Sequence, residues 1–205
     1  MQEKKVSISE SLQGLLQQMT PQQEGRVVEM FQFYMQQYGD LRVDNNAESV
    51  SDAIHKAIDN SIEETINDSA DAVSCGKSCS FCCYQQVDIT DDEATLITEY
   101  SKEIGLEIPY NSLERQEKEK YIDLPFQDKK CVFLNEKDDC SIYEHRPSAC
   151  RKLLSVSEPI LCDIEKHPNG QIKKLVSIEA EVITSSSLNV RESGSMGKML
   201  LKAKK

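Results

Sequence analysis

The stretch Cys75-Gly76-Lys77-Ser78-Cys79-Ser80-Phe81-Cys82-Cys83 carries four of the eight cysteines of this 205-residue chain, in the spacing C-x3-C-x2-C-C. The other four are Cys131, Cys140, Cys150 and Cys162, so neither flank of the chain contains a cysteine. Such a density indicates disulfides in a secreted chain and metal ligation in a reducing compartment. No apolar run of signal-peptide length follows the first residues, so we expect a cytoplasmic protein whose cysteines bind metal.

Composition excludes several classes of function. The 24 basic and 35 acidic residues give a net charge of -11, whereas a nucleic-acid-binding protein normally presents a basic face. The same charge disfavours an anionic membrane surface, and no apolar stretch approaches the roughly 20 residues of a membrane span. We therefore expect that neither nucleic acid nor a membrane is a partner. The composition leaves another protein as the kind of partner to consider.

Charge and cysteine content divide the chain into three parts. Residues 1–74 form a helical N-terminal region with a balance of -8, residues 75–165 a cysteine-cluster metal-binding domain with -8, and residues 166–205 a C-terminal element and basic tail with +5. We expect the end of this tail, from Lys198 to Lys205, to be mobile, and the tail either to fold back on acidic helices or to contact a partner.

The helical signals are strongest before the cysteines. Thr20-Pro21-Gln22-Gln23 is a capping box that opens a helix, which Gly39 is expected to end near Tyr38. A further helix begins near Ser49 or Ser51, with isoleucines at every fourth position from 54 to 66.

The later part of the chain predicts shorter elements. A short strand is predicted at residues 87–89, and Thr90 and Glu93 form a capping box that opens a helix. Two more short strands are predicted at residues 131–134 and 141–143. Pro147 begins a short helix with Cys150, while residues 172–183 fit helix and strand equally. The expected fold class is mainly α with short β pieces, with a small irregular cysteine-ligated domain after the helical region.

Thiolate chemistry limits how the first four cysteines are used. If they lay on one continuous helix, Cys75 and Cys83 would be about 12 Å apart, too far to share one zinc ion. Either the stretch loops around a metal or later cysteines supply ligands. Cys82 and Cys83 point in different directions, so one ligates while the other packs, or they serve two centres. The wide spacing of the last four cysteines favours an iron–sulfur cluster over paired zinc knuckles.

Other candidates near the cysteines carry less information. Lys77, Arg146, Arg151 and Lys152 are cations that could face thiolates, with ordinary surface positions as the alternative. His145 is a candidate ligand or a surface residue beside a turn, and His55 and His167 have no partner by spacing.

The spacing of Cys75, Cys79 and Cys82, with Phe81 before the third, resembles the cluster motif of radical S-adenosylmethionine enzymes. Those enzymes place the motif after the first strand of a partial α/β barrel, and no strand–helix alternation follows Cys83 here. The resemblance would make S-adenosylmethionine a cofactor.

A resemblance over residues 75–151 involves more motifs. The run C-x3-C-x2-C-C, then Cys131-Val132-Phe133-Leu134, then the stretch from Cys140-Ser141-Ile142-Tyr143 to Arg146-Pro147 and Cys150-Arg151, resembles the YkgJ-type cysteine-cluster family. That family is described as chelating zinc or iron, and a similar module occurs in flagellin lysine N-methylases. The metal ligands that follow from the resemblance, with Cys162 added from outside its pattern, are Cys75, Cys79, Cys82, Cys83, Cys131, Cys140, Cys150 and Cys162.

Three functions therefore stand as hypotheses. The first is a cysteine-cluster protein with an iron–sulfur ([4Fe–4S]) centre. The second is a structural or interaction module with zinc. The third, by resemblance alone, is a protein-lysine methyltransferase-like enzyme. The residues identify no catalytic group and do not decide whether the chain is an enzyme.

Overall fold

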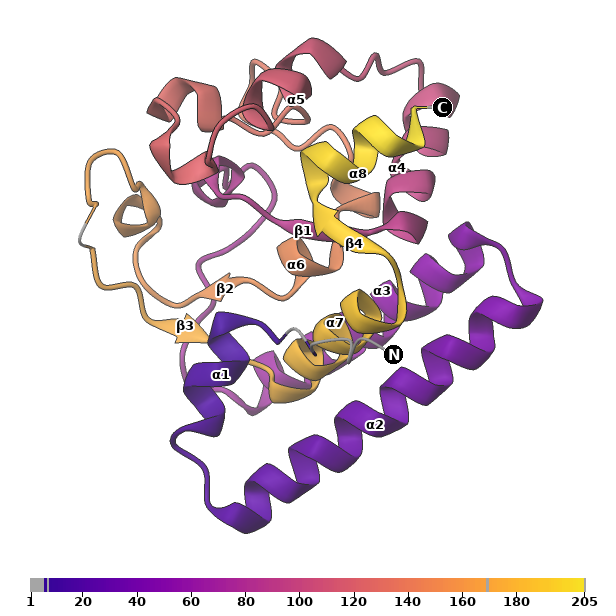
Figure 1. Cartoon of the computed structure of the whole chain (residues 1–205). Coiled ribbons are helices and arrows are strands. Elements are labelled where there is room, and N and C mark those ends of the chain that lie inside the picture. The colour runs from indigo at the N-terminus through magenta and orange to yellow at the C-terminus, as the bar shows by residue number, and fades with distance from the viewer. Residues whose placement is uncertain (1–5, 7, 169, 205) are drawn as a thin grey trace.

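The computed structural model describes residues 6, 8–168 and 170–204, and Figure 1 shows their arrangement. This part of the chain is mainly α-helical with short β pieces, which confirms the expected fold class. The helices are α1 (Glu10–Leu16), α2 (Pro21–Asp44), α3 (Ala47–Asp68), α4 (Asp91–Glu103), α5 (Tyr110–Gln116), α6 (Ser148–Arg151), α7 (Ile178–Val190) and α8 (Met196–Ala203). The strands are β1 (Asp88–Thr90), β2 (Leu154–Ser155), β3 (Lys174–Leu175) and β4 (Ser193–Ser195).

A helical layer of α1, α2, α3 and α7 forms the lower half of the molecule in Figure 1. Isoleucines of α3, among them Ile54 and Ile58, pack with Tyr38 of α2 and Ile183 of α7. Helix α7 is buried along most of its length although it is rich in serine and threonine. Thr184, for example, donates its hydroxyl to the carbonyl of Ala180 in the preceding turn, so these small polar residues are buried with partners.

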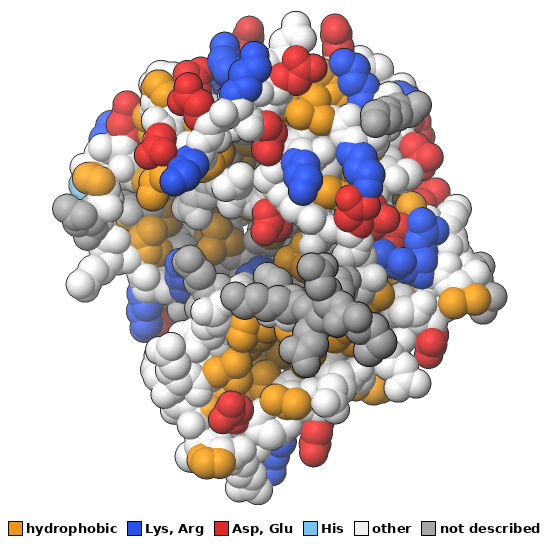
Figure 2. Space-filling model, viewed as in Figure 1, with side chains coloured by type: hydrophobic (Ala, Val, Ile, Leu, Met, Phe, Trp, Pro, Cys, Tyr) orange, Lys and Arg blue, Asp and Glu red, His pale blue; other side chains and the backbone are white. Residues whose placement is uncertain are grey.

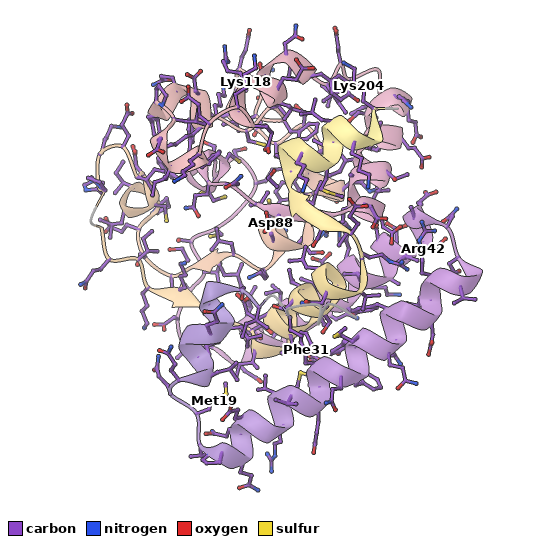
Figure 3. The ribbon with its side chains drawn as sticks, in the orientation of Figure 1. Met19, Phe31, Arg42, Asp88, Lys118 and Lys204 are labelled. Atoms are coloured by element: carbon purple, nitrogen blue, oxygen red, sulfur yellow. The ribbon has the colours of Figure 1, made fainter. Side chains whose placement is uncertain are left out.

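Helix α2 runs six residues past the end expected at Tyr38, because Gly39 does not stop it. A glycine inside a helix costs about 1 kcal/mol. Leu41, one turn later, packs against the same core as Tyr38, and Arg42 pairs with the buried carboxylate of Asp92 at 3.0 Å. Arg42 is labelled near the end of α2 in Figure 3. Tertiary contacts thus outweigh the local stop signal.

A second core lies in the upper half, where α4, α5 and α8 meet the β1–β4 sheet. The sheet is antiparallel, with Ile89 opposite Gly194. The expectation of a mobile C-terminal tail was wrong, because residues 196–203 form α8 and Met199 and Leu200 are buried in this core. Lys204 lies over the ring of Tyr110, with its Nζ 4.4 Å from the centroid. The last forty residues thus contribute α7 to one core and α8 to the other.

The surface on the face in Figure 2 carries acidic and basic side chains interspersed over the upper elements. In Figure 3, Phe31 of α2 is labelled beside α7, and its carbonyl accepts the Ser186 hydroxyl at 3.3 Å. None of the helices in the described ranges is both long and apolar enough to cross a membrane.

Candidate metal centre

The first cysteine lies beside the β2–β3 sheet. After α3, the chain extends along β2, where Ser74 N–H donates to the Ser155 carbonyl at 2.8 Å. Ser155 N–H donates in return to the Cys75 sulfur at 3.1 Å. Burial raises the pKa of the Cys75 thiol, and this amide lowers it in part. The backbone of β2 is therefore placed to stabilise a thiolate at position 75.

The segment from Cys79 to Cys83 folds into tight turns and does not continue as a helix from Cys75. Cys79 N–H donates to the Gly76 carbonyl at 3.1 Å, and Ser78 has a positive φ of 71°. A short 3-10 helix, η1 (Phe81–Tyr84), follows and carries Cys82 and Cys83. The stretch therefore loops, which was one of the two alternatives for bringing these thiols near a metal.

Cys131 and Cys140 lie in turns that face one another. Cys131 N–H donates to the Cys83 carbonyl at 2.7 Å, which ties this region to η1. The prediction of two strands at residues 131–134 and 141–143 was wrong. The described residues contain only a single bridge there, between Leu134 and Cys140. The backbone instead curls so that Phe133 N–H faces the Cys131 sulfur and Ile142 N–H faces the Cys140 sulfur.

Cys150 lies on α6, the short helix expected after Pro147. Two buried charged side chains, Glu93 and Arg151, hold this helix in place. The Glu93 carboxylate accepts Ser148 N–H at 2.7 Å. Arg151 donates to Asp59 of α3 at 2.6 Å and to the Arg146 carbonyl at 2.9 Å. The position of this cysteine is thus set by contacts to α3 and α4.

Cys162 ends another 3-10 helix, η5 (Pro159–Cys162), which packs against η1. It lies outside the sequence pattern that the resemblance supplied, but the fold places it close enough to Cys75 and Cys79 to raise the pKa of both. The sequence signal for this was only that Cys162 lies in the same cysteine-rich window.

Cys82 lies at the centre of the thiols. Its charge raises the pKa of Cys75 and Cys79 on one side and the pKa of Cys83 on the other. Its charge also raises the pKa of Cys131, Cys140 and Cys150. Cys162 acts in the same way on Cys75 and Cys79, so the eight thiols lie within electrostatic reach of their neighbours. We refer to them as the thiol cluster.

The thiols of the cluster differ in how readily they ionise. A hydrogen bond from the Cys83 thiol lowers the pKa of Cys82 to about 7, with the nearby Arg146 guanidinium also contributing. Burial raises the pKa of Cys131 to about 12 and that of Cys150 well above its usual value. Buried thiols with raised pKa values become thiolates when a cation takes the place of the proton.

Of the basic residues considered from the sequence, Arg146 is the one whose charge acts on the thiols, at Cys82 and Cys140. Arg151 instead pairs with Asp59, and Lys152 pairs with Glu181 at 2.5 Å. The ring of His145 packs against Tyr100 with centroids 4.2 Å apart. His55, which has no partner by sequence spacing, faces Glu93 across the interface between α3 and α4.

The donor set suits thiophilic metals by its chemistry, because eight free thiols are gathered around backbone amides and one guanidinium. The positions are not those of a finished coordination shell: no three His, Cys, Asp or Glu of the described ranges are arranged to hold an ion. The ligand set expected from the sequence therefore stays a prediction, and its members are Cys75, Cys79, Cys82, Cys83, Cys131, Cys140, Cys150 and Cys162.

Fold and donor set together define a cysteine-thiolate metal-binding domain. Residues 74–174 match a family described as "CxxCxxCC: Putative zinc- or iron-chelating domain". Over these residues the match confirms the cysteine-cluster family that the sequence motifs resemble. Comparisons with curated proteins and with solved structures find no significant match. The strands in the described residues form two separate two-stranded sheets, unlike the partial α/β barrel of radical S-adenosylmethionine enzymes.

Proposed function

We propose that this protein is a cytoplasmic iron–sulfur protein whose thiol cluster holds a [4Fe–4S] centre. The observation that carries the proposal is that the family match contains eight cysteines from five separate segments of the chain, which the fold brings within electrostatic reach of one another. Iron–sulfur clusters are held by cysteine thiolates and need ligands that surround a body larger than a single ion. Ligands drawn from the turns at Cys79, Cys131 and Cys140 suit such a body.

Backbone amides directed at sulfur give further support. The Ser155 amide faces the sulfur of Cys75, and the Phe81 amide faces that of Cys79. In the same way the Phe133 amide faces the sulfur of Cys131, and the Ile142 amide faces that of Cys140. Hydrogen bonds to cluster sulfurs and solvent exposure are two means by which a protein sets the reduction potential. A partly exposed centre with these bonds is suited to electron exchange or redox sensing.

Anaerobic purification tests the proposal, with iron, zinc and acid-labile sulfide measured on one sample together with the visible spectrum. We expect iron and sulfide in equal amounts and broad absorption that bleaches on reduction. Zinc without sulfide would overturn the iron–sulfur assignment but leave metal binding intact. Protein that contains neither metal, and takes up neither under reducing conditions, would overturn both.

Zinc is the second candidate because of the small hairpin that joins Cys131 to Cys140. Its turn is held by Asn135, whose side chain accepts the N–H groups of Lys137 and Asp139. It presents two cysteines whose sulfurs each face amides two residues later, an arrangement that would suit half of a closed tetrahedral site. In that case the metal would supply folding energy and the helices would serve a protein partner. Zinc removal should then unfold the region around residues 131–150.

A further inference from the structure

A cavity of about 430 Å³ opens at the surface of the helical layer, where the starts of α2 and α7 meet the last turns of α3. Small-molecule sites commonly have volumes of about 300–1,000 Å³. The described residues that line this cavity include no cysteine, and all of them lie outside the range 74–174 of the family match. The cavity is therefore separate from the candidate metal centre.

Several residues of the lining are apolar. Val27 of α2 is 6% exposed, and the half-buried side chains of Met19 and Met30 pack against the same small core. Ile178, at the start of α7, lines the cavity and is 38% exposed. Met19 is labelled in Figure 3 where the chain passes from α1 to α2. Methionine side chains adapt to ligands of different shapes, so this lining suits the apolar body of a ligand.

Three carboxylates line the same cavity. Glu64 and Asp68 are exposed and one turn apart on α3, and neither forms an ion pair with a described residue. Glu179 accepts the Tyr34 hydroxyl at 2.5 Å and has no cationic partner among the described residues. Arg26 is the one cation among the described lining residues, so these charged side chains leave the cavity with a net charge of -2.

The end of α3 adds to the negative potential. The last carbonyls of a helix carry a partial negative charge, which a basic residue in the last turn normally offsets. Helix α3 has no basic residue in its last turn, and Asp68 is its final residue. The positive end of α7 is already offset, because Ser177 caps the Ala180 N–H at 3.2 Å and Glu179 lies in the first turn. A capping box likewise closes the start of α2. The cavity therefore favours a cation.

Buried hydroxyls supply acceptors in the same lining. Ser61 and Ser177 are 4% and 5% exposed, and their Oγ atoms lie 2.6 Å apart. Since a hydroxyl has one hydrogen and two lone pairs, the pair keeps acceptor capacity after this bond. Thr65 donates its hydroxyl to the Ser61 carbonyl at 2.7 Å, which leaves the Thr65 oxygen as an acceptor. Acceptors of this kind suit the N–H groups of an ammonium ion.

We propose that this cavity binds a small organic cation, an ammonium group joined to an apolar body. The ammonium group lies near Glu64 and Asp68 at the end of α3. The apolar body packs against Met19, Met30 and Ile178. A metal ion would leave the apolar lining without a contact, and an organic anion would meet three carboxylates. The proposal goes beyond the proposed function and does not depend on it.

The test is a titration of the full-length protein, carrying carbon-13 at its methionine methyl groups, with phenethylamine. We expect the methyl signals of Met19 and Met30 to shift, while those of Met196 and Met199 in the upper core stay in place. Phenylpropionate has a similar apolar body and the opposite charge. It should bind at least about tenfold more weakly, because it replaces ion pairs with repulsion.

Three charge variants on α3 locate the ammonium group. Glu64→Gln and Asp68→Asn should each weaken phenethylamine binding about two- to fivefold, as expected for exposed ion pairs. Glu63→Gln removes the same charge from the same helix, but Glu63 does not line the cavity. At about 0.15 M salt, where distant charges are screened, this control should bind as the wild type does.

Four outcomes would overturn the proposal. Equal affinities for the amine and the carboxylate would show that charge does not select the ligand. Millimolar amine that shifts neither Met19 nor Met30 would exclude the cavity as the site. Equal weakening by Glu63→Gln and Asp68→Asn would reduce the effect to net charge.

The fourth outcome concerns a protein as the occupant. An alternating lysine–leucine heptapeptide that shifts the signals of Met19 and Met30, when phenethylamine does not, would make the cavity a docking surface for a basic protein and overturn the small-ligand proposal. None of these measurements bears on the iron, zinc or sulfide content, so failure here leaves the proposed function standing.

Discussion

His55 Nε2 lies 3.1 Å from Glu93 Oε1, and both side chains are buried between α3 and α4. The same carboxylate accepts Ser148 N–H at 2.7 Å and Thr90 N–H at 3.0 Å. Burial by itself would raise the pKa of Glu93, but the bonds and the charge interaction with His55 lower it to about 2. One carboxylate thus joins the helical layer, the start of α4 and the helix that carries Cys150.

This carboxylate predicts acid sensitivity. The pKa of Glu93 falls from 4.5 to about 2 on folding, so its contribution to stability is present above about pH 4.5 and is lost as the pH falls toward 2. The shift corresponds to about 3 kcal/mol in the free energy of unfolding. Urea denaturation at a series of pH values measures it. A Glu93→Gln variant that loses as much stability in acid as the wild type would contradict this origin.

The charge of Glu93 can be tested apart from its capping role. Glutamine is accepted at the third position of a capping box, so Glu93→Gln keeps the start of α4 but removes the carboxylate that faces His55. Leaving a buried polar group without its hydrogen-bond partner costs about 1–3 kcal/mol. We expect a loss of this size in chemical denaturation. Glu99→Gln, on the exposed face of the same helix, should change stability by less than about 0.5 kcal/mol.

Two glycines predict different effects. A Cβ at Gly197 would stand 2.6 Å from Glu117 Oε1, which accepts the Ser195 hydroxyl at 2.7 Å. Gly197→Ala should therefore displace this exposed carboxylate, and the lost hydrogen bond of about 1 kcal/mol offsets the similar gain of an alanine in a helix. A Cβ at Gly39 of α2 meets no atom within 4 Å, so Gly39→Ala should raise stability by about 1 kcal/mol. Thermal unfolding of both variants compares the two shifts, and equal shifts would disprove the contact at Gly197.

The buried C-terminal helix makes a further prediction. Met199 is 1% exposed and lies in the upper core, so Met199→Ala should cost about 2–5 kcal/mol. Lys202 of the same helix pairs with Glu192 at the surface, so Lys202→Ala serves as the control and should have little effect. Denaturant titration compares the two. Equal stability of both variants would show that α8 does not contribute to the core.

Local signals predicted the parts of the fold that depend on a few neighbouring residues. The capping boxes at Thr20 and Thr90 both form, and the helix after Pro147 is present. The predicted end of α2 at Gly39 failed because contacts with distant residues hold the helix beyond it. The predicted strand at residues 131–134 failed because its amides turn toward sulfur, which hydrophobic alternation does not reveal.

The sequence predicted which residue type forms the candidate site but not how its members are grouped. Cys162 follows Cys75 by 87 positions, and only the packing of η5 on η1 brings them together. His55 and Glu93 are 38 residues apart, and the capping box that contains Glu93 gives no sign of His55 as its partner. Such long-range pairs are set by tertiary packing, so spacing alone could not identify them.

The place of α8 in the chain has a consequence for biosynthesis. All eight cysteines precede Met199 and Leu200, which complete the upper core. Synthesis proceeds from the N-terminus, so the nascent chain presents its thiols before the helix that finishes their surroundings has been made. The thiols are therefore accessible during translation, and the arrival of α8 completes the core against which Cys131 and Cys140 pack.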